Sequence, residues 1–114
     1  MSRPSVAAAS RARAAAPLFA ALGDETRLQL VLRLSRGGPE STARLSEESS
    51  ITRQAITKHL EVLAAAGFVQ GRRIGRERLW ELQPKRLADA REYLDRISRQ
   101  WDSALGRLKT FVET

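Results

Sequence analysis

Arginine side chains are concentrated in one short stretch of this sequence, and their spacing indicates what they could bind. Residues 70–78 contain four arginines and a single acid, which are Arg72, Arg73, Arg76, Arg78 and Glu77. Four positive charges against one negative charge leave the stretch at +3. Because guanidinium groups pair with phosphate oxygens, we expect these arginines to contact a phosphate backbone or a minor groove. Arg76, in the middle, should reach furthest.

A predicted helix that follows Thr52 and stops at Gly67 carries a second group of polar side chains. Its Ile56, Leu60 and Leu63 recur at helical spacing, so this face should be buried. The candidate contact residues at the start of the helix and on its other sides are Thr52, Arg53, Gln54, Thr57, Lys58 and His59.

These side-chain types match the chemistry of a DNA groove. Arginine and glutamine bond the edges of guanine and adenine, and threonine offers a hydroxyl to phosphate and a methyl to thymine. We therefore predict that Arg53, Gln54 and Thr57 contact bases and that Lys58 contacts a phosphate. His59 stands at the margin of the apolar face, where it could be a half-buried residue that fixes the helix.

The apolar pattern predicts the elements that hold these two groups. The expected helices, after a disordered tail at 1–10, cover residues 11–22, 25–36, 42–49, 53–66 and 85–114. The first helix could instead begin at Pro17, since proline suits a first turn. The second carries leucines on more than one face and should be the most buried. Three residues join the third and fourth helices, which makes a helix-turn-helix.

A change of period after Gly67 predicts a β-hairpin, followed by one long helix. Gly75 and Arg76 suit a two-residue turn, and Trp80 on the returning strand should anchor the hairpin to the body. The terminal helix carries an apolar seam at steps of three and four: Leu87, Ala90, Leu94, Ile97, Trp101, Ala104, Leu108 and Phe111. Such a seam is typical of a coiled-coil interface.

Composition restricts the class of protein. The 114 residues suit one domain, here 11–114, and 20 Lys+Arg against 13 Asp+Glu give a net charge of +7, which favours a polyanionic partner. The absence of cysteine excludes disulfides and thiolate metal sites. No apolar run approaches a membrane span. The Ala-, Ser- and Arg-rich start superficially looks like a transit peptide, although abundant arginine and alanine also suit a GC-rich bacterial genome.

Three segments together resemble the ArsR family of bacterial winged-helix repressors. They are Leu22-Gly23-Asp24-Glu25-Thr26-Arg27-Leu28, the run Ile51-Thr52-Arg53-Gln54-Ala55-Ile56-Thr57-Lys58-His59-Leu60-Glu61-Val62-Leu63, and Ala66-Gly67-Phe68-Val69. The resemblance spans roughly residues 17–112. It implies a phosphate contact for His59 and a homodimer built from the first and last helices. The implied interface residues are Leu18, Phe19, Leu22, Leu94, Ile97, Trp101, Leu108 and Phe111.

The sequence departs from the metal sensors of that family. Residues 42–49 hold no cysteine and the terminal helix holds no histidine, whereas metal sensors carry their ligands at these places. Asp89, Glu92, Asp95 and Asp102 alternate with arginines, which favours a salt-bridged face over a metal site. The sequence therefore resembles the metal-independent branch, whose inducer is a small molecule, a partner protein or unknown.

The sequence thus predicts a mainly α fold with a small β-hairpin: a winged helix-turn-helix of five helices, with a two-stranded wing between the fourth and fifth. We expect a cytoplasmic, dimeric repressor that binds an inverted repeat in double-stranded DNA, without cofactor, metal or membrane. No catalytic constellation is present at useful spacing, so an enzyme is not expected. The alternative is a winged-helix protein-interaction module that does not bind DNA.

Overall fold

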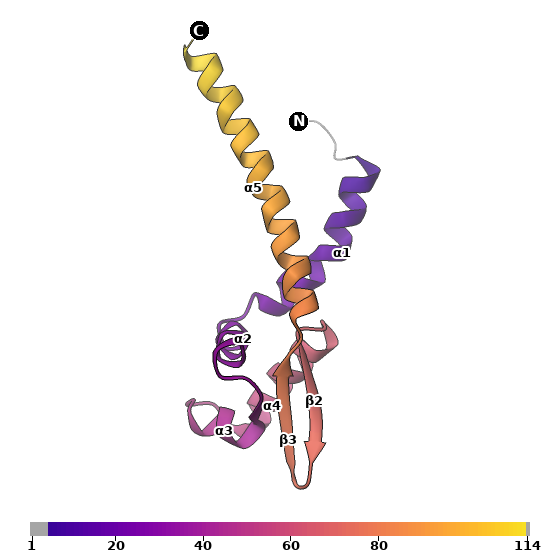
Figure 1. Cartoon of the computed structure of the whole chain (residues 1–114), viewed down its shortest axis with the longest axis vertical. Coiled ribbons are helices and arrows are strands. Elements are labelled where there is room, and N and C mark those ends of the chain that lie inside the picture. The colour runs from indigo at the N-terminus through magenta and orange to yellow at the C-terminus, as the bar shows by residue number, and fades with distance from the viewer. Residues whose placement is uncertain (1–4, 114) are drawn as a thin grey trace.

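The computed structural model describes residues 5–113 and shows a small winged body from which two helices rise (Figure 1). In chain order the elements are α1 (Val6–Leu22), α2 (Glu25–Gly37), β1 (Glu40–Ser41), α3 (Thr42–Glu47), α4 (Arg53–Ala65), β2 (Val69–Ile74), β3 (Glu77–Leu82) and α5 (Pro84–Glu113). The molecule is elongated, measuring 67 × 29 × 20 Å, because the far half of α5 extends away from the body. Within residues 5–113, none of the helices combines the length and the hydrophobicity that a membrane span requires.

Side-chain caps fix where most of the helices begin. Asp24 accepts a hydrogen bond from the backbone N–H of Arg27, and Thr52 accepts one from that of Ala55. Each bond satisfies a donor that the first turn of a helix leaves without an intrahelical partner. The second and fourth helices therefore begin where the sequence predicts, directly after Asp24 and Thr52.

The first helix differs from the prediction. It begins at Val6, with Ser5 as its cap, rather than at Arg11 or Pro17, so the proposed disordered tail at 1–10 is helical from residue 6. The cause is the alanine-rich composition of this segment, since alanine has high helix propensity even where no apolar periodicity exists. Residues 1–4 of the predicted tail lie outside the described residues.

The core lies where α4 packs against α2, α3 and the sheet. Ile56, Leu60 and Leu63 of α4 are fully buried, as the apolar spacing predicts. They share one cluster with Phe68 and Trp80, which are also fully buried. The α4 face away from this cluster is therefore the one left for a ligand.

The second helix is less buried than predicted. Leu30, Val31 and Leu34 enter the core, whereas Leu28 and Leu32 are about half exposed. Its leucines do cover two faces, but the body is only thick enough to bury one of them. The interpretation of this helix as the most buried one is wrong, and α4 holds that place.

The wing, which we define as the hairpin of β2 and β3, turns at the predicted position. Gly75 has a φ of 61°, a conformation that glycine adopts without a steric penalty. A third strand, β1, pairs antiparallel with β3 and places Glu40 opposite Trp80, giving the sheet order β1-β3-β2. Sequence analysis predicted a two-stranded unit and missed β1, because two residues have no detectable period.

Candidate nucleic-acid interface

The first two turns of α4 present the predicted polar side chains to solvent. Thr52, Arg53, Gln54 and Lys58 are exposed, on the side of α4 away from its buried face. Thr57 is only half exposed, and its hydroxyl donates to the backbone oxygen of Arg53 at 2.9 Å. The proton of the Thr57 hydroxyl is thus already engaged, which leaves the acceptor lone pairs of the oxygen and the methyl group as the parts able to meet a base.

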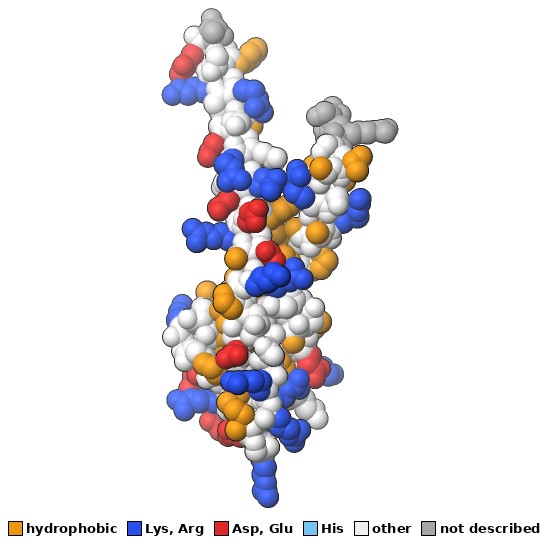
Figure 2. Space-filling model, turned by 45° about the vertical axis from the view of Figure 1, so that its right-hand side comes forward, with side chains coloured by type: hydrophobic (Ala, Val, Ile, Leu, Met, Phe, Trp, Pro, Cys, Tyr) orange, Lys and Arg blue, Asp and Glu red, His pale blue; other side chains and the backbone are white. Residues whose placement is uncertain are grey.

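The wing carries exposed arginines on both faces and at its end. Arg72 lies 3.9 Å from Glu81, and Arg78 lies 3.6 Å from Glu61 of α4. None of the ion pairs formed within residues 5–113 involves Arg73 or Arg76. Figure 2 shows a basic side chain projecting from the lower end of the molecule, where Figure 1 places the turn of the wing.

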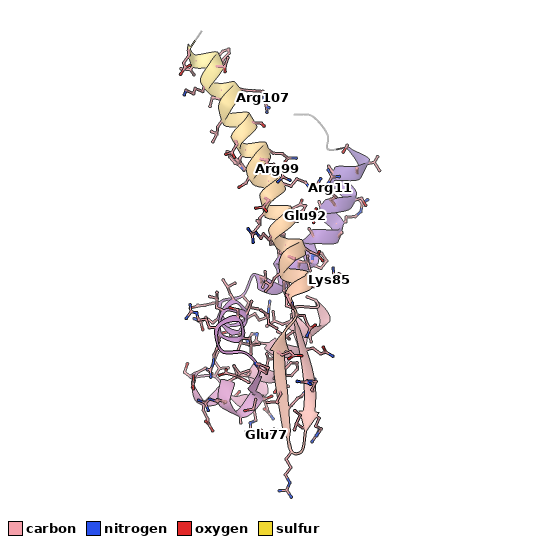
Figure 3. All side chains as sticks on the ribbon, in the orientation of Figure 1. Arg11, Glu77, Lys85, Glu92, Arg99 and Arg107 are labelled. Atoms are coloured by element: carbon pink, nitrogen blue, oxygen red, sulfur yellow. The ribbon has the colours of Figure 1, made fainter. Side chains whose placement is uncertain are left out.

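The fold brings the two predicted groups together across one groove. A groove of about 230 Å³ separates the start of α4 from the wing, and Figure 3 shows Glu77 at this lower end of the molecule. The residues that line it are Ser41, Thr42, Ala43, Arg53, Thr57, Arg76, Glu77 and Arg78. Three arginines from two elements therefore converge on one surface, and their local charge favours a polyanion.

His59 does not join this surface. Its Nδ1 lies 3.8 Å from the carboxylate of Asp24 and 3.5 Å from the guanidinium of Arg27, between α4 and the start of α2. Arg27 also donates to the backbone oxygen of Ala21 at the end of α1. The hydrogen bond from the backbone N–H of Arg27 lowers the pKa of Asp24 below 3.8, although partial desolvation opposes it, and nearby His59 lowers it further. His59 thus lies at a junction of three helices.

A bridge that sequence analysis did not find holds the helix-turn-helix on the body. The guanidinium of Arg33 on α2 contacts Glu40 of β1 at 2.6 Å and Glu48, the residue directly after α3, at 2.8 Å. All three residues look like ordinary surface charges in the sequence. One glutamate belongs to β1 and the other follows α3, so only tertiary packing brings both to one arginine, and no local signal could have revealed the bridge.

The predicted dimer residues fall into two groups. Leu18 is only 7% exposed, Leu22 packs against the core of its own chain, and the ring of Phe19 lies 5.8 Å from that of Tyr93. These three residues of α1 are mostly used within the chain. By contrast, the predicted residues of α5 are exposed in the single chain: Leu94, Ile97, Trp101, Leu108 and Phe111.

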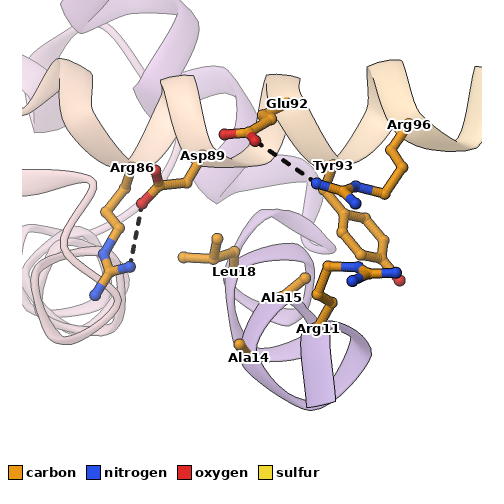
Figure 4. A pocket seen from close by; sticks show the side chains of 9 residues that line it. All are labelled: Arg11, Ala14, Ala15, Leu18, Arg86, Asp89, Glu92, Tyr93 and Arg96. Carbon is orange, nitrogen blue, oxygen red and sulfur yellow. Dashed lines mark hydrogen bonds and ion pairs between the residues drawn. The ribbon is translucent and has the colours of Figure 1, made fainter. Parts of the chain in front are cut away.

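A shallow cleft separates α1 from the first half of α5. Figure 4 shows Ala14, Ala15 and Leu18 of α1 facing α5 across it.

On α5, Asp89, Glu92 and Asp95 each form an ion pair with an arginine, so the predicted salt-bridged face is confirmed for these three acids. In Figure 3, Arg107 lies far along α5, beyond the part that α1 accompanies.

The fold and this basic surface define a winged helix-turn-helix protein of the DNA-binding type, and known proteins agree with this class. A family described as a helix-turn-helix domain matches residues 22–72. HTH-type transcriptional regulator Rv2034 of Mycobacterium tuberculosis is 39% identical over 85 residues, which cover 75% of this chain and 76% of that protein. HTH-type transcriptional repressor SmtB of the same species is 33% identical over 92 residues, covering 81% of this chain and 66% of the repressor.

Among solved structures, an ArsR-like transcriptional regulator from Rhodococcus sp. RHA1 superposes with a TM-score of 0.73 and 35% identity. The superposition covers 87% of this chain and 92% of that one. The chain therefore belongs to the ArsR family of winged helix-turn-helix transcriptional regulators. No cluster of three or more possible metal-binding side chains occurs among residues 5–113.

Proposed function

We propose that this regulator represses transcription as a homodimer that inserts α4 into the major groove and lays the wing on the neighbouring backbone. The observation that carries the proposal is the groove in which Arg53 of α4 lies across from Arg76 of the wing. A helix and a β-ribbon that both present cations to one surface suit a duplex, whose phosphates flank an accessible major groove.

Each exposed side chain receives a role from its place and chemistry. Arg53 and Gln54 occupy the first turn of α4, where side chains of a recognition helix meet base edges. Lys58 is one turn further along and suits a phosphate, as does Thr52 at the cap. We assign His59 to positioning α4, because it contacts the junction of α1 and α2 rather than the groove.

Arginines of the wing should bind without regard to base sequence. Arg73 and Arg76 form no ion pair among the described residues, so no intramolecular pairing has to be broken before they meet phosphates or a minor groove. Arg72 pairs at 3.9 Å with Glu81, and both side chains are exposed, so this ion pair contributes little to stability. Arg72 can therefore leave Glu81 and contact DNA as well.

The exposed apolar seam of α5 supports the homodimer. Leu94, Trp101 and Leu108 are each more than half exposed in the single chain, and they follow one stripe along the helix. A second copy would bury this stripe by the hydrophobic effect. Two-fold symmetry would then place two copies of α4 in successive major grooves, about 34 Å apart, and the operator would be an inverted repeat.

Repression is the proposed mode of action, because SmtB, the relative described above, is named a repressor.

The signal that releases DNA is proposed to be something other than a soft metal. The chain has no cysteine and one histidine, so thiolate and convergent imidazole ligands are missing. A small molecule or a partner protein is the proposed effector. Such a non-enzymatic regulator, built as a single domain, would act on chromosomal DNA in the cytoplasm.

Binding measurements with two kinds of variant test this proposal. Gln54→Ala or Arg53→Ala should cost about 1–3 kcal/mol and relax the preference at particular base pairs. Arg76→Ala or Arg73→Ala should weaken specific and non-specific DNA alike, and lower the slope of log affinity against log salt by about one. If Gln54→Ala and Arg76→Ala are both silent, the protein-interaction module should replace the DNA-binding account.

A further inference from the structure

Arg78 differs from the other arginines of the wing because its side chain contacts the body of the protein. Its guanidinium lies over the ring of Trp80, 4.2 Å from the ring centre, and one of its nitrogens lies 3.6 Å from the carboxylate of Glu61. Glu61 belongs to the third turn of α4, on the recognition helix itself. Arg78 therefore contacts the wing and the helix at the same time.

Trp80 gives this arrangement a fixed base. It is fully buried, and its indole N–H donates to the hydroxyl of Thr42 at 2.8 Å. Thr42 is the first residue of α3, and its hydroxyl also lies 3.4 Å from the backbone oxygen of Arg78. The hydroxyl of one residue in the helix-turn-helix thus fixes the strand that carries Arg78.

Gly71 leaves the space in which the two side chains stack. It lies opposite Trp80 in the β2–β3 ladder. A Cβ atom at Gly71 would come within 2.9 Å of the Trp80 ring and 3.1 Å of Nε of Arg78, which is closer than such atoms pack. The backbone at Gly71 does not have a positive φ, so this glycine is required for space and not for conformation.

We propose that Arg78 is a positioning residue that locks the wing to the recognition helix through Trp80 and Glu61, and that it does not act as a phosphate contact. This inference rests on the proposed function, because the lock matters where α4 and the wing bind one duplex together. A wing held at a fixed angle loses little conformational freedom on binding, so Arg76 can reach the backbone while Arg53 and Gln54 occupy the groove.

The direction in which one substitution changes the affinity for DNA distinguishes the lock from a purely electrostatic effect. Glu61→Gln removes a negative charge close to the DNA-binding surface, and electrostatics alone would then raise the affinity for DNA. The lock predicts the opposite. We expect Glu61→Gln to weaken binding to a specific operator about fivefold, as loss of an exposed ion pair with a stacked cation should. The salt slope should not change, because no phosphate contact is lost.

Glu81→Gln is the matched control, since Glu81 pairs with Arg72 on the other face of the wing. It should leave affinity unchanged or raise it. Arg78→Lys provides a second arm: lysine keeps the charge but not the flat guanidinium, so it should bind as weakly as Arg78→Ala at an unchanged salt slope. An affinity for Glu61→Gln equal to or above wild type, or a wild-type affinity for Arg78→Lys, would overturn the proposal.

Hydrogen exchange without DNA tests the lock independently of the proposed function. Backbone amides of β2 and β3 should exchange faster in Glu61→Gln than in Glu81→Gln, because the wing opens more often once it is released from α4. Equal exchange in the two variants would contradict the lock. A wild-type protein that binds no DNA, with the same difference in exchange, would instead refute the proposed function and leave the lock standing.

Discussion

Replacing Trp101 by alanine should separate the proposed dimer into monomers without unfolding the chain. Trp101 lies past the middle of α5, and it is 63% exposed in the single chain. Its side chain contributes little to the core of its own protomer, which consists of residues in α1 to α4, the start of α5 and the sheet. The substitution therefore tests the interface and spares the fold.

The exposed area of Trp101 sets the size of the expected effect. A tryptophan can bury up to about 250 Å², so the exposed 63% corresponds to about 160 Å² that a partner could cover. At about 25 cal/mol per Å², this burial stabilises the dimer by roughly 4 kcal/mol per protomer. Alanine would retain about a quarter of this stabilisation, so each protomer loses about 3 kcal/mol. The dimer carries the substitution in both protomers and therefore loses about 6 kcal/mol, which is equivalent to about 10⁴-fold in the dissociation constant.

Sedimentation velocity from nanomolar to high micromolar concentration measures this change. The wild type should sediment as a dimer at micromolar concentration, and Trp101→Ala as a monomer with unchanged helix content by circular dichroism. Gln100→Ala, an exposed polar neighbour on the same helix, is the control and should remain dimeric. A variant that dimerises as tightly as the wild type, or a wild type that is monomeric throughout, would refute the assignment of this seam to a second copy.

Three other outcomes follow from the site and its supports. Thr52→Ala should lower the free energy of unfolding by about 1 kcal/mol in urea denaturation, through loss of the α4 cap, whereas Ser50→Ala should not. Asp24→Ala should lower the Tm at neutral pH. The folded-state pKa of Asp24 is depressed, so its stabilisation is complete above the ordinary value of 3.8 and fades as the pH falls below it; a difference in Tm that persists at pH 2 would contradict this. Zinc, copper, cadmium and arsenite at stoichiometric levels should leave the DNA complex intact. Tight zinc binding in calorimetry that disappears in Asp95→Ala or Asp102→Ala would show that carboxylates form a metal site after all.

Local signals in the sequence were sufficient for the elements that hold the DNA-facing surface. Asp24 and Thr52 cap helices because their short side chains reach a backbone N–H three residues away, and this depends on nothing distant. Gly75 at the wing turn and the buried face of α4 are equally local, since they follow from φ preference and helical period. The fold class and the position of the wing were therefore predictable.

Features that depend on tertiary register were not predictable. Arg78 looks like its neighbours in the sequence, and only the pairing of Gly71 with Trp80 places it over an indole ring and beside Glu61. The same is true of Arg33, whose two glutamate partners lie in β1 and directly after α3 and come together only in the folded chain. A count of charges treats all arginines as equivalent cations. The packing instead separates arginines that are available to contact DNA from arginines that hold elements of the fold together.

Selection of bound sequences from random double-stranded DNA, with the purified wild-type protein and Gln54→Ala in parallel, shows whether α4 reads DNA. We expect the wild type to enrich an imperfect inverted repeat whose half-sites are centred about one helical turn apart. We expect Gln54→Ala to change the preferred base at defined positions in both half-sites while the spacing stays the same. No enriched sequence, or one motif shared unchanged by both proteins, would contradict the claim that α4 reads DNA.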